Sequence, residues 1–226
     1  MLKKFSILFA AGLVVTLPSA FAATNLQISL QETGYSDTTS SSPSGAVSIN
    51  NMNYGDFQIN TVSGIGSPVF GAPTLDLQTL NITSTSLAAS HTLTIMLTQT
   101  GVTGLSNPFS FLSNFSGILT GVTSEQITSY VDPSNTAFGT ADQLSTVHFT
   151  AAGSNAFNQV AQGPTANPFS ETEIIVATFA PTTTGDGLNS SAVISSAVPE
   201  PASLALLGGG LLGLAFIRRR SAKKSN

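Results

Sequence analysis

Few side chains in this 226-residue chain could act in acid–base catalysis or bind a metal ion. Between residues 23 and 198 they are two histidines, ten carboxylates and three tyrosines. Cysteine is absent, which excludes a thiolate metal site, a cysteine nucleophile and any disulfide. The Gly-x-Ser-x-Gly and His-Glu-x-x-His motifs are also missing. A serine–histidine–aspartate triad built from separate loops stays open, but we predict that His91 and His148 are structural or solvent-facing.

The carboxylates offer three arrangements. Glu171 and Glu173 share one face of an extended strand, a spacing that a glycosidase or a Ca²⁺ site could use. No substrate-gripping aromatic residues or ligand loop accompany this pair, which we therefore predict to lie on the surface. Asp132 with Asn135, and Asp186 between two glycines, lack the repeated aspartate spacing of an EF-hand. We expect no catalytic, cofactor-binding or metal-binding residue, and no enzyme.

Charge is distributed unevenly along the chain. All seven Lys and Arg residues lie near the ends, at Lys3, Lys4, Arg218, Arg219, Arg220, Lys223 and Lys224. The intervening segment has ten carboxylates and no Lys or Arg, and therefore a formal charge of −10. This composition removes arginine clamps for phosphate and opposes binding to nucleic acid or anionic lipid headgroups. We expect no nucleic-acid partner.

The N-terminal segment has the three parts of a secretory signal peptide. Two lysines precede an apolar run over residues 5–17, and Ala20 and Ala22 supply the small side chains that signal peptidase accepts. Cleavage is predicted after Ala22, with Ala23 as the alternative. The apolar run is too short to span a membrane comfortably, which disfavours a retained anchor.

The C-terminal segment combines a short motif, an apolar stretch and a cationic end. The motif is Val198, Pro199, Glu200 and Pro201, the stretch is residues 202–217, and the end is Arg218, Arg219 and Arg220. Such a stretch inserts in a bilayer and keeps its arginines on the cytoplasmic side. As a helix it would extend about 24 Å, less than the roughly 30 Å of a hydrocarbon core. This length predicts a short, temporary transmembrane anchor.

In its order of parts this tail resembles the PEP-CTERM sorting signal of Gram-negative bacteria. The resemblance covers only the end of the chain and implies that an exosortase, a membrane cysteine protease, reads it near Pro199, Glu200 and Pro201. With the signal peptide, it implies an inner-membrane-anchored intermediate and then a protein at the cell surface or outside the cell. The alternative is an ordinary C-terminal membrane helix with a chance Pro-Glu-Pro.

Between the two signals, apolar and polar residues alternate with period two. Residues 92–99 are the clearest strand, with Leu93, Ile95 and Leu97 on one face and threonines on the other. Residues 171–180 are apolar on both faces, which is typical of a central strand. Further strands are expected at residues 25–31, 46–50, 56–62, 74–84, 109–112, 115–119, 125–131, 144–151, 156–162 and 191–196.

Two irregular segments interrupt this pattern. A change of parity within residues 74–84 predicts a bulge near Gln78 or Thr79. Residues 33–44, rich in Ser and Thr, are predicted to form a loop. Since no long helical period appears, the strands predict an all-β domain, a β-sandwich or jelly roll. The expected organisation is a signal peptide at 1–22, an all-β extracytoplasmic domain at 23–197 and a sorting signal at 198–226.

Three functions are compatible with these features. The first is a non-enzymatic exported protein, associated with the cell surface or with an extracellular matrix such as that of a biofilm. The second is a carbohydrate-binding module of an exopolysaccharide matrix, although the chain has no Trp and only three Tyr to stack on sugars. The third is a secreted hydrolase with a site assembled across loops. The expected partners are signal peptidase, exosortase, the membrane and, for the second function, extracellular polysaccharide.

Overall fold

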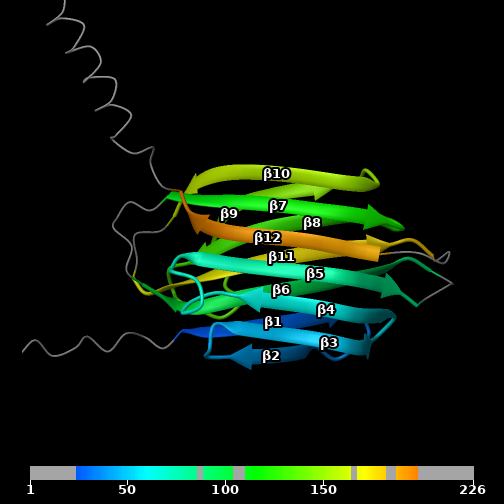
Figure 1. Cartoon of the computed structure of the whole chain (residues 1–226), viewed down its shortest axis with the longest axis horizontal. Coiled ribbons are helices and arrows are strands. Elements are labelled where there is room, and N and C mark those ends of the chain that lie inside the picture. The colour runs from blue at the N-terminus through cyan, green and yellow to red at the C-terminus, as the bar shows by residue number, and fades with distance from the viewer. Residues whose placement is uncertain (1–23, 86–88, 104–109, 164–166, 182–186, 198–226) are drawn as a thin grey trace, which may run out of the picture.

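The computed structural model of the chain describes residues 24–85, 89–103, 110–163, 167–181 and 187–197. Within these ranges it forms twelve β-strands (Figure 1). They are β1 (Asn25–Glu32), β2 (Thr38–Ser42), β3 (Ala46–Tyr54), β4 (Phe57–Ile65), β5 (Thr74–Ser84), β6 (His91–Val102), β7 (Ser110–Thr120), β8 (Val122–Asp132), β9 (Asp142–Phe149), β10 (Gly153–Gln162), β11 (Phe169–Phe179) and β12 (Gly187–Ser196). The predicted signal peptide and sorting signal lie outside the described residues. In the described part, no helix is long and apolar enough to cross a membrane.

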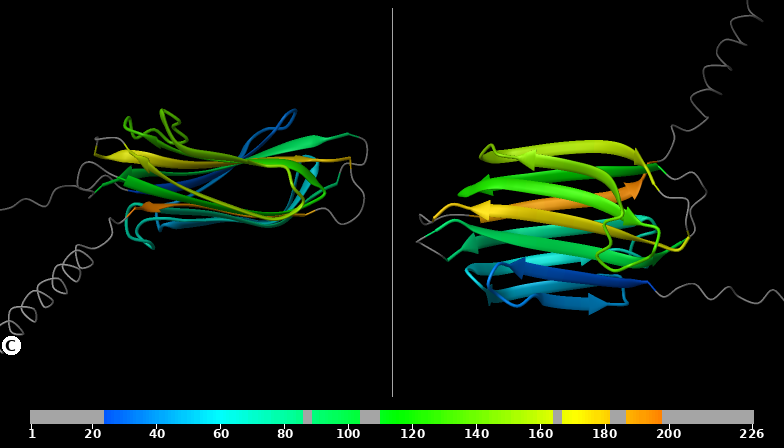
Figure 2. Two further views of the ribbon diagram at one scale, coloured as in Figure 1. Left: turned by 90° about the horizontal axis from the view of Figure 1, so that it is seen from above. Right: turned by 180° about the vertical axis from the view of Figure 1, so that it is seen from behind.

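The strands form two six-stranded antiparallel sheets. Sheet A has the order β2-β1-β6-β11-β8-β9, and sheet B has the order β10-β7-β12-β5-β4-β3. The view from above in Figure 2 shows the two sheets packed face to face. The predicted all-β sandwich is therefore confirmed, and β11 lies inside its sheet as predicted for residues 171–180.

Most connections after β5 pass from one sheet to the other. From β5 to β12, only β8 and β9 are consecutive strands of the same sheet. The hairpins β1-β2 and β3-β4 lie at one edge of sheets A and B, opposite the edge that β9 and β10 form. Because of these crossings, side chains remote in sequence face each other across the interior.

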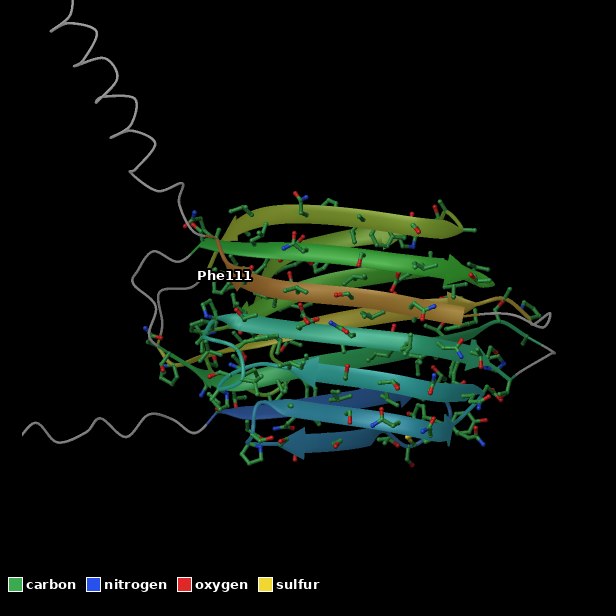
Figure 3. The ribbon with its side chains drawn as sticks, viewed as in Figure 1. Phe111 is labelled. Carbon is green, nitrogen blue, oxygen red and sulfur yellow. The ribbon has the colours of Figure 1, made fainter. Side chains whose placement is uncertain are left out.

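Large apolar side chains join the two inner faces. Phe57 of β4 and Phe179 of β11 are fully buried, with ring centroids 5.1 Å apart. Phe111 of β7, labelled in Figure 3, meets Phe169 of β11 edge-on at 5.9 Å. Aromatic pairs in such tilted arrangements contribute beyond the area that they bury. In a chain without cysteine, this packing must hold the sheets together.

The prediction of a loop over residues 33–44 is wrong for its centre. Residues 38–42 form β2, which pairs with β1 at the edge of sheet A. No apolar alternation marks this strand, because an edge strand with two polar faces needs only backbone pairing. Polar edges of this kind also discourage pairing with other molecules.

The predicted bulge exists but lies slightly beyond Gln78 and Thr79. Asn81 adopts a positive φ of 51°, and the register between β5 and β12 shifts at this point. The Asn81 amide donates a hydrogen bond to Asn189 Oδ1 at 2.9 Å. Asparagine tolerates the left-handed region better than most residues. The extra residue lets both Thr79 and Ile82 face the interior.

The two short strands predicted at residues 109–112 and 115–119 are one strand, β7, in the described part. Gly117 does not interrupt it but lies on its inner face. A Cβ at this position would overlap Oε2 of Glu125, which reaches across from sheet A. The glycine is thus a place where a side chain of the opposite sheet is accommodated.

Candidate functional site

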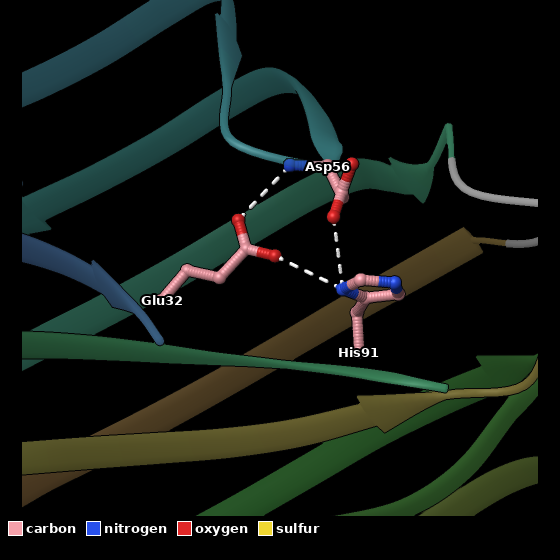
Figure 4. A group of neighbouring side chains, drawn as sticks. All are labelled: Glu32, Asp56 and His91. Atoms are coloured by element: carbon pink, nitrogen blue, oxygen red, sulfur yellow. Dashed lines mark hydrogen bonds and ion pairs between the residues drawn. The ribbon is translucent and has the colours of Figure 1, made fainter. Parts of the chain in front are cut away.

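One pole of the sandwich carries a cluster of Glu32, Asp56 and His91 (Figure 4). Nδ1 of His91 lies 2.9 Å from Oδ2 of Asp56 and 3.3 Å from Oε1 of Glu32. The Glu32 side chain is 2% exposed, and those of His91 and Asp56 are 25% and 30% exposed. The cluster is therefore set into the protein but open to solvent on one side.

Backbone contacts fix all three residues. Glu32 is the last residue of β1, and His91, the first of β6, pairs with Phe179 of β11. Asp56 lies in the turn between β3 and β4. Its amide donates to Glu32 Oε2 at 3.0 Å, and its carbonyl accepts the Thr85 amide at 2.8 Å. The cluster thus joins sheet A to sheet B.

Gly55 makes room for this arrangement. It has a positive φ of 55°, and a Cβ there would overlap Oε2 of Glu32. The phenol of Tyr35 lies nearby, and its pKa is raised. The largest cause is the charge of Asp56, followed by desolvation and then by the charge of Glu32. Chemically, the cluster can act as a histidine–carboxylate ion pair or as a set of one nitrogen and two oxygen donors for a cation.

No sequence motif indicates this cluster. Glu32 and Asp56 are 24 residues apart in the chain, and no spacing motif links them to His91. His91 contacts both carboxylates, and its structural role stays a prediction. His148 is exposed on β9, as predicted for a solvent-facing histidine.

Asp132 and Asn135, weighed as oxygen donors in the sequence, use these oxygens inside the fold. Asp132 Oδ1 accepts the Ser134 amide at 2.8 Å, and Asn135 Oδ1 accepts the Gly101 amide at 2.7 Å. These bonds close the turn that follows β8 and hold its loop against β6. Asp186 lies outside the described residues.

The prediction that Glu171 and Glu173 lie on the surface is wrong. They share one face of β11, but that face points into the sandwich, and both are fully buried. Glu125 of β8 is buried as well. Their carboxylate oxygens accept no hydrogen bond of good geometry from the described residues. With no Lys or Arg in the domain, none of the three has a cationic partner of that kind.

Burial sets the protonation of these glutamates, because a charged carboxylate is costly in an apolar interior. Burial raises the pKa of Glu171 to about 8. It raises the pKa of Glu125 to about 7, partly offset by the Ser190 hydroxyl. Burial, with the charges of Asp76 and Glu171, raises the pKa of Glu173 well above its ordinary value, against the opposing backbone amides of Leu77 and Ile194. Burial therefore favours the neutral form of these acids, least strongly at Glu125.

The outer face of sheet B carries a shallow polar hollow of about 400 Å³. Ser116, Asn155 and Ser191 are among the residues that line it. Some of its amides are already engaged: Asn155 Nδ2 donates to the carbonyls of Ala151 and Gly153. The hollow offers hydroxyl and amide groups but no aromatic platform.

Comparisons with solved structures find similar β folds at low identity. TmCBM61 in complex with β-1,4-galactotriose matches at 6% identity and a TM-score of 0.35, covering 75% of this chain and 88% of its own. A family 16 carbohydrate-binding module matches at 15% identity and a TM-score of 0.28, covering 62% and 85%. The K3 adhesin domain of Lys-gingipain from Porphyromonas gingivalis W83 matches at 15% and 0.28, covering 54% and 74%. No curated protein matches the chain.

The end of the chain gives a direct match. The last described residue, Ala197, still donates its amide to the Ser110 carbonyl at 2.8 Å, so the tail follows the sandwich immediately. The predicted motif Val198, Pro199, Glu200 and Pro201 and the arginines lie just beyond, as Ala20 and Ala22 lie before the described part. Residues 197–220 match the PEP-CTERM protein-sorting motif, which marks this chain as an exported substrate of an exosortase.

Proposed function

We propose that this chain is a non-enzymatic exported protein that is displayed at the cell surface or retained in an extracellular matrix. The observation that carries the proposal is the sorting motif, which follows the sandwich without a spacer. Before processing, the tail would hold the domain at the inner membrane, with its arginines on the cytoplasmic side. Exosortase action near Pro199 would then release the domain from this anchor.

The arrangement of the strands supports display of one pole. β1 begins and β12 ends at the same pole (Figure 1), whereas Glu32, Asp56 and His91 lie at the other. A strand of the length of β12 spans about 30 Å. The cluster would therefore point away from the anchored end. The alternation of β5 to β12 between the sheets favours the jelly-roll form of the sandwich.

The processing step is tested by replacing both prolines of the motif, Pro199→Ala with Pro201→Ala. In cells with an exosortase, the unchanged protein should lose the segment from residue 202 onward, whereas the variant should stay full-length and cell-bound. Mass spectrometry of the C-terminus measures this. Pro181→Ala, in an exposed part of the chain, is the matched control and should be processed normally. An intact C-terminus through Asn226 on surface or released protein would contradict processing.

The matrix role is separable from processing. Cells that lack the protein should attach and aggregate less well than the parent strain, and the processed protein should be recovered in the matrix fraction of the parent strain. Normal attachment together with absence of the protein from the matrix would refute this role even if the tail is cleaved.

A second candidate function is carbohydrate binding, favoured by the polar hollow on sheet B. Sugar hydroxyls would exchange hydrogen bonds with its hydroxyl and amide groups. If so, the protein should bind at least one polysaccharide on an array, and Ser191→Phe, which fills the middle of the hollow, should abolish that binding. Ser48→Phe, on the outer side of β3, is the control. Absence of binding by folded protein would remove this candidate.

A further inference from the structure

Glu32, Asp56 and His91 have the donor types and spacing of a divalent-cation site. Their ligand atoms all lie within 4.8 Å of one another, and the two contacts of His91 Nδ1 measure 2.9 and 3.3 Å. Zinc binds nitrogen and oxygen donors at about 2.0–2.2 Å, so two donors on one ion lie roughly 3.0–3.4 Å apart at angles between 90° and 109°. The two measured separations are close to this range.

A second observation concerns Glu32 alone. Its side chain is 2% exposed, and Oε1 makes no hydrogen bond of good geometry, only the 3.3 Å contact with Nδ1 of His91 (Figure 4). Oε2 is occupied, because it accepts the Asp56 amide. A buried carboxylate oxygen without a well-formed hydrogen bond is costly. A bound cation would satisfy this oxygen directly.

Charge also favours a cation. The segment from residue 23 to residue 198 has no Lys or Arg, so neither carboxylate can be neutralised by those side chains. Two carboxylates meet at one imidazole, and a divalent cation would balance their negative charges. One imidazole nitrogen and two carboxylate oxygens suit a borderline transition metal better than Ca²⁺, which prefers oxygen donors throughout.

We propose that these three residues bind one divalent transition-metal ion, Zn²⁺ being the reference case. Three protein donors leave at least one coordination position open toward solvent. Because Glu32 and His91 belong to sheet A and Asp56 precedes a strand of sheet B, the ion fastens the two sheets at this pole. The site is independent of how the tail is processed.

The test titrates Zn²⁺ into the full chain, purified in mild detergent and stripped with a chelator, at about pH 7.5, where imidazole is mainly neutral. We expect one Zn²⁺ per chain by calorimetry and a higher unfolding temperature with the ion than without it. His91→Ala should weaken binding at least about tenfold and lose the temperature shift. His148→Ala is the matched control, because it removes the other, exposed imidazole and should leave both results unchanged.

Two further measurements distinguish a loss of Zn²⁺ binding from misfolding of the His91→Ala variant. Asp56→Asn keeps the shape of the side chain but removes its charge, and should also weaken Zn²⁺ binding. With only two histidines, long-range ¹H–¹⁵N spectra resolve each ring, and Zn²⁺ should shift Nδ1 of His91 and not the ring of His148. No stabilisation of the unchanged protein, equal binding by His91→Ala, or a shift only at His148 would each overturn the proposal and leave the cluster as an ion pair.

Discussion

The variant Glu171→Gln should unfold at a higher temperature than the unchanged protein at pH 8, and this advantage should vanish below about pH 4.5. Burial raises the pKa of Glu171 from 4.5 to about 8 in the folded state. The folded protein therefore keeps its proton where the unfolded chain has lost it. The contribution of the Glu171 carboxyl to folding stability is therefore fully present below about pH 4.5, and it is lost as the pH rises toward 8.

The expected size is large for one side chain. At about 1.4 kcal/mol per pKa unit, the Glu171 carboxyl should cost on the order of 4 kcal/mol of folding free energy between these two pH values. Glutamine does not titrate, so its variant should show a flatter pH profile. Glu125→Gln should act in the same direction but less, because burial raises that pKa only to about 7.

Thermal unfolding followed by circular dichroism from pH 4 to 9 measures both effects. Asp142→Asn is the control, since this carboxylate is exposed at the start of β9 and should leave the slope unchanged. An unfolding temperature of the unchanged protein that stays level or rises from pH 5 to pH 8 would show that the buried glutamates are not held neutral.

Truncation of Phe179 should produce the other large effect. Phe179 is fully buried, packs against Phe57 of the opposite sheet at 5.1 Å, and pairs through its backbone with His91. Phe179→Ala should lower the free energy of unfolding by about 3–5 kcal/mol, because it removes buried apolar surface and leaves a cavity. In a domain of this size the unfolding temperature should drop by roughly 10 °C.

Phe70→Ala provides the comparison, because Phe70 is 37% exposed in the loop between β4 and β5. The same chemical change there should cost little. Chemical denaturation of both variants at one pH gives the two free energies. If the Phe179 and Phe70 variants lost similar stability, the contact between Phe57 and Phe179 would not be a principal junction between the sheets.

Local pattern was enough to place most strands. Residues 74–84 were predicted with the bounds of β5, and Leu93, Ile95 and Leu97 face the core as their alternation indicated. A period-two repeat reflects the geometry of a single strand, so it is legible without knowledge of neighbours. Strand β2 has no such repeat of apolar residues, because its Ser and Thr residues pair at an edge and bury little apolar surface.

The two chemically notable features depended on tertiary structure. Alternation places Glu171 and Glu173 on one face, but β11 also carries Ile174 and Val176 on the other face, so the pattern did not distinguish inside from outside. The packing of sheet B over β11 determines that the face with Glu171 and Glu173 points inward. Gly117 supports a similar burial at Glu125, and its role also appears only when the opposite sheet is in place.

By itself, the sequence determined the strand periodicity, the confinement of Lys and Arg to the ends, and the sorting motif at residues 197–220, because each is a property of contiguous residues. Only the tertiary structure decided that Glu125, Glu171 and Glu173 are buried and that Glu32, Asp56 and His91 meet. The physical reason is that these contacts arise between strands of two sheets, whose pairing and crossing are set by packing of the whole chain and not by any local pattern.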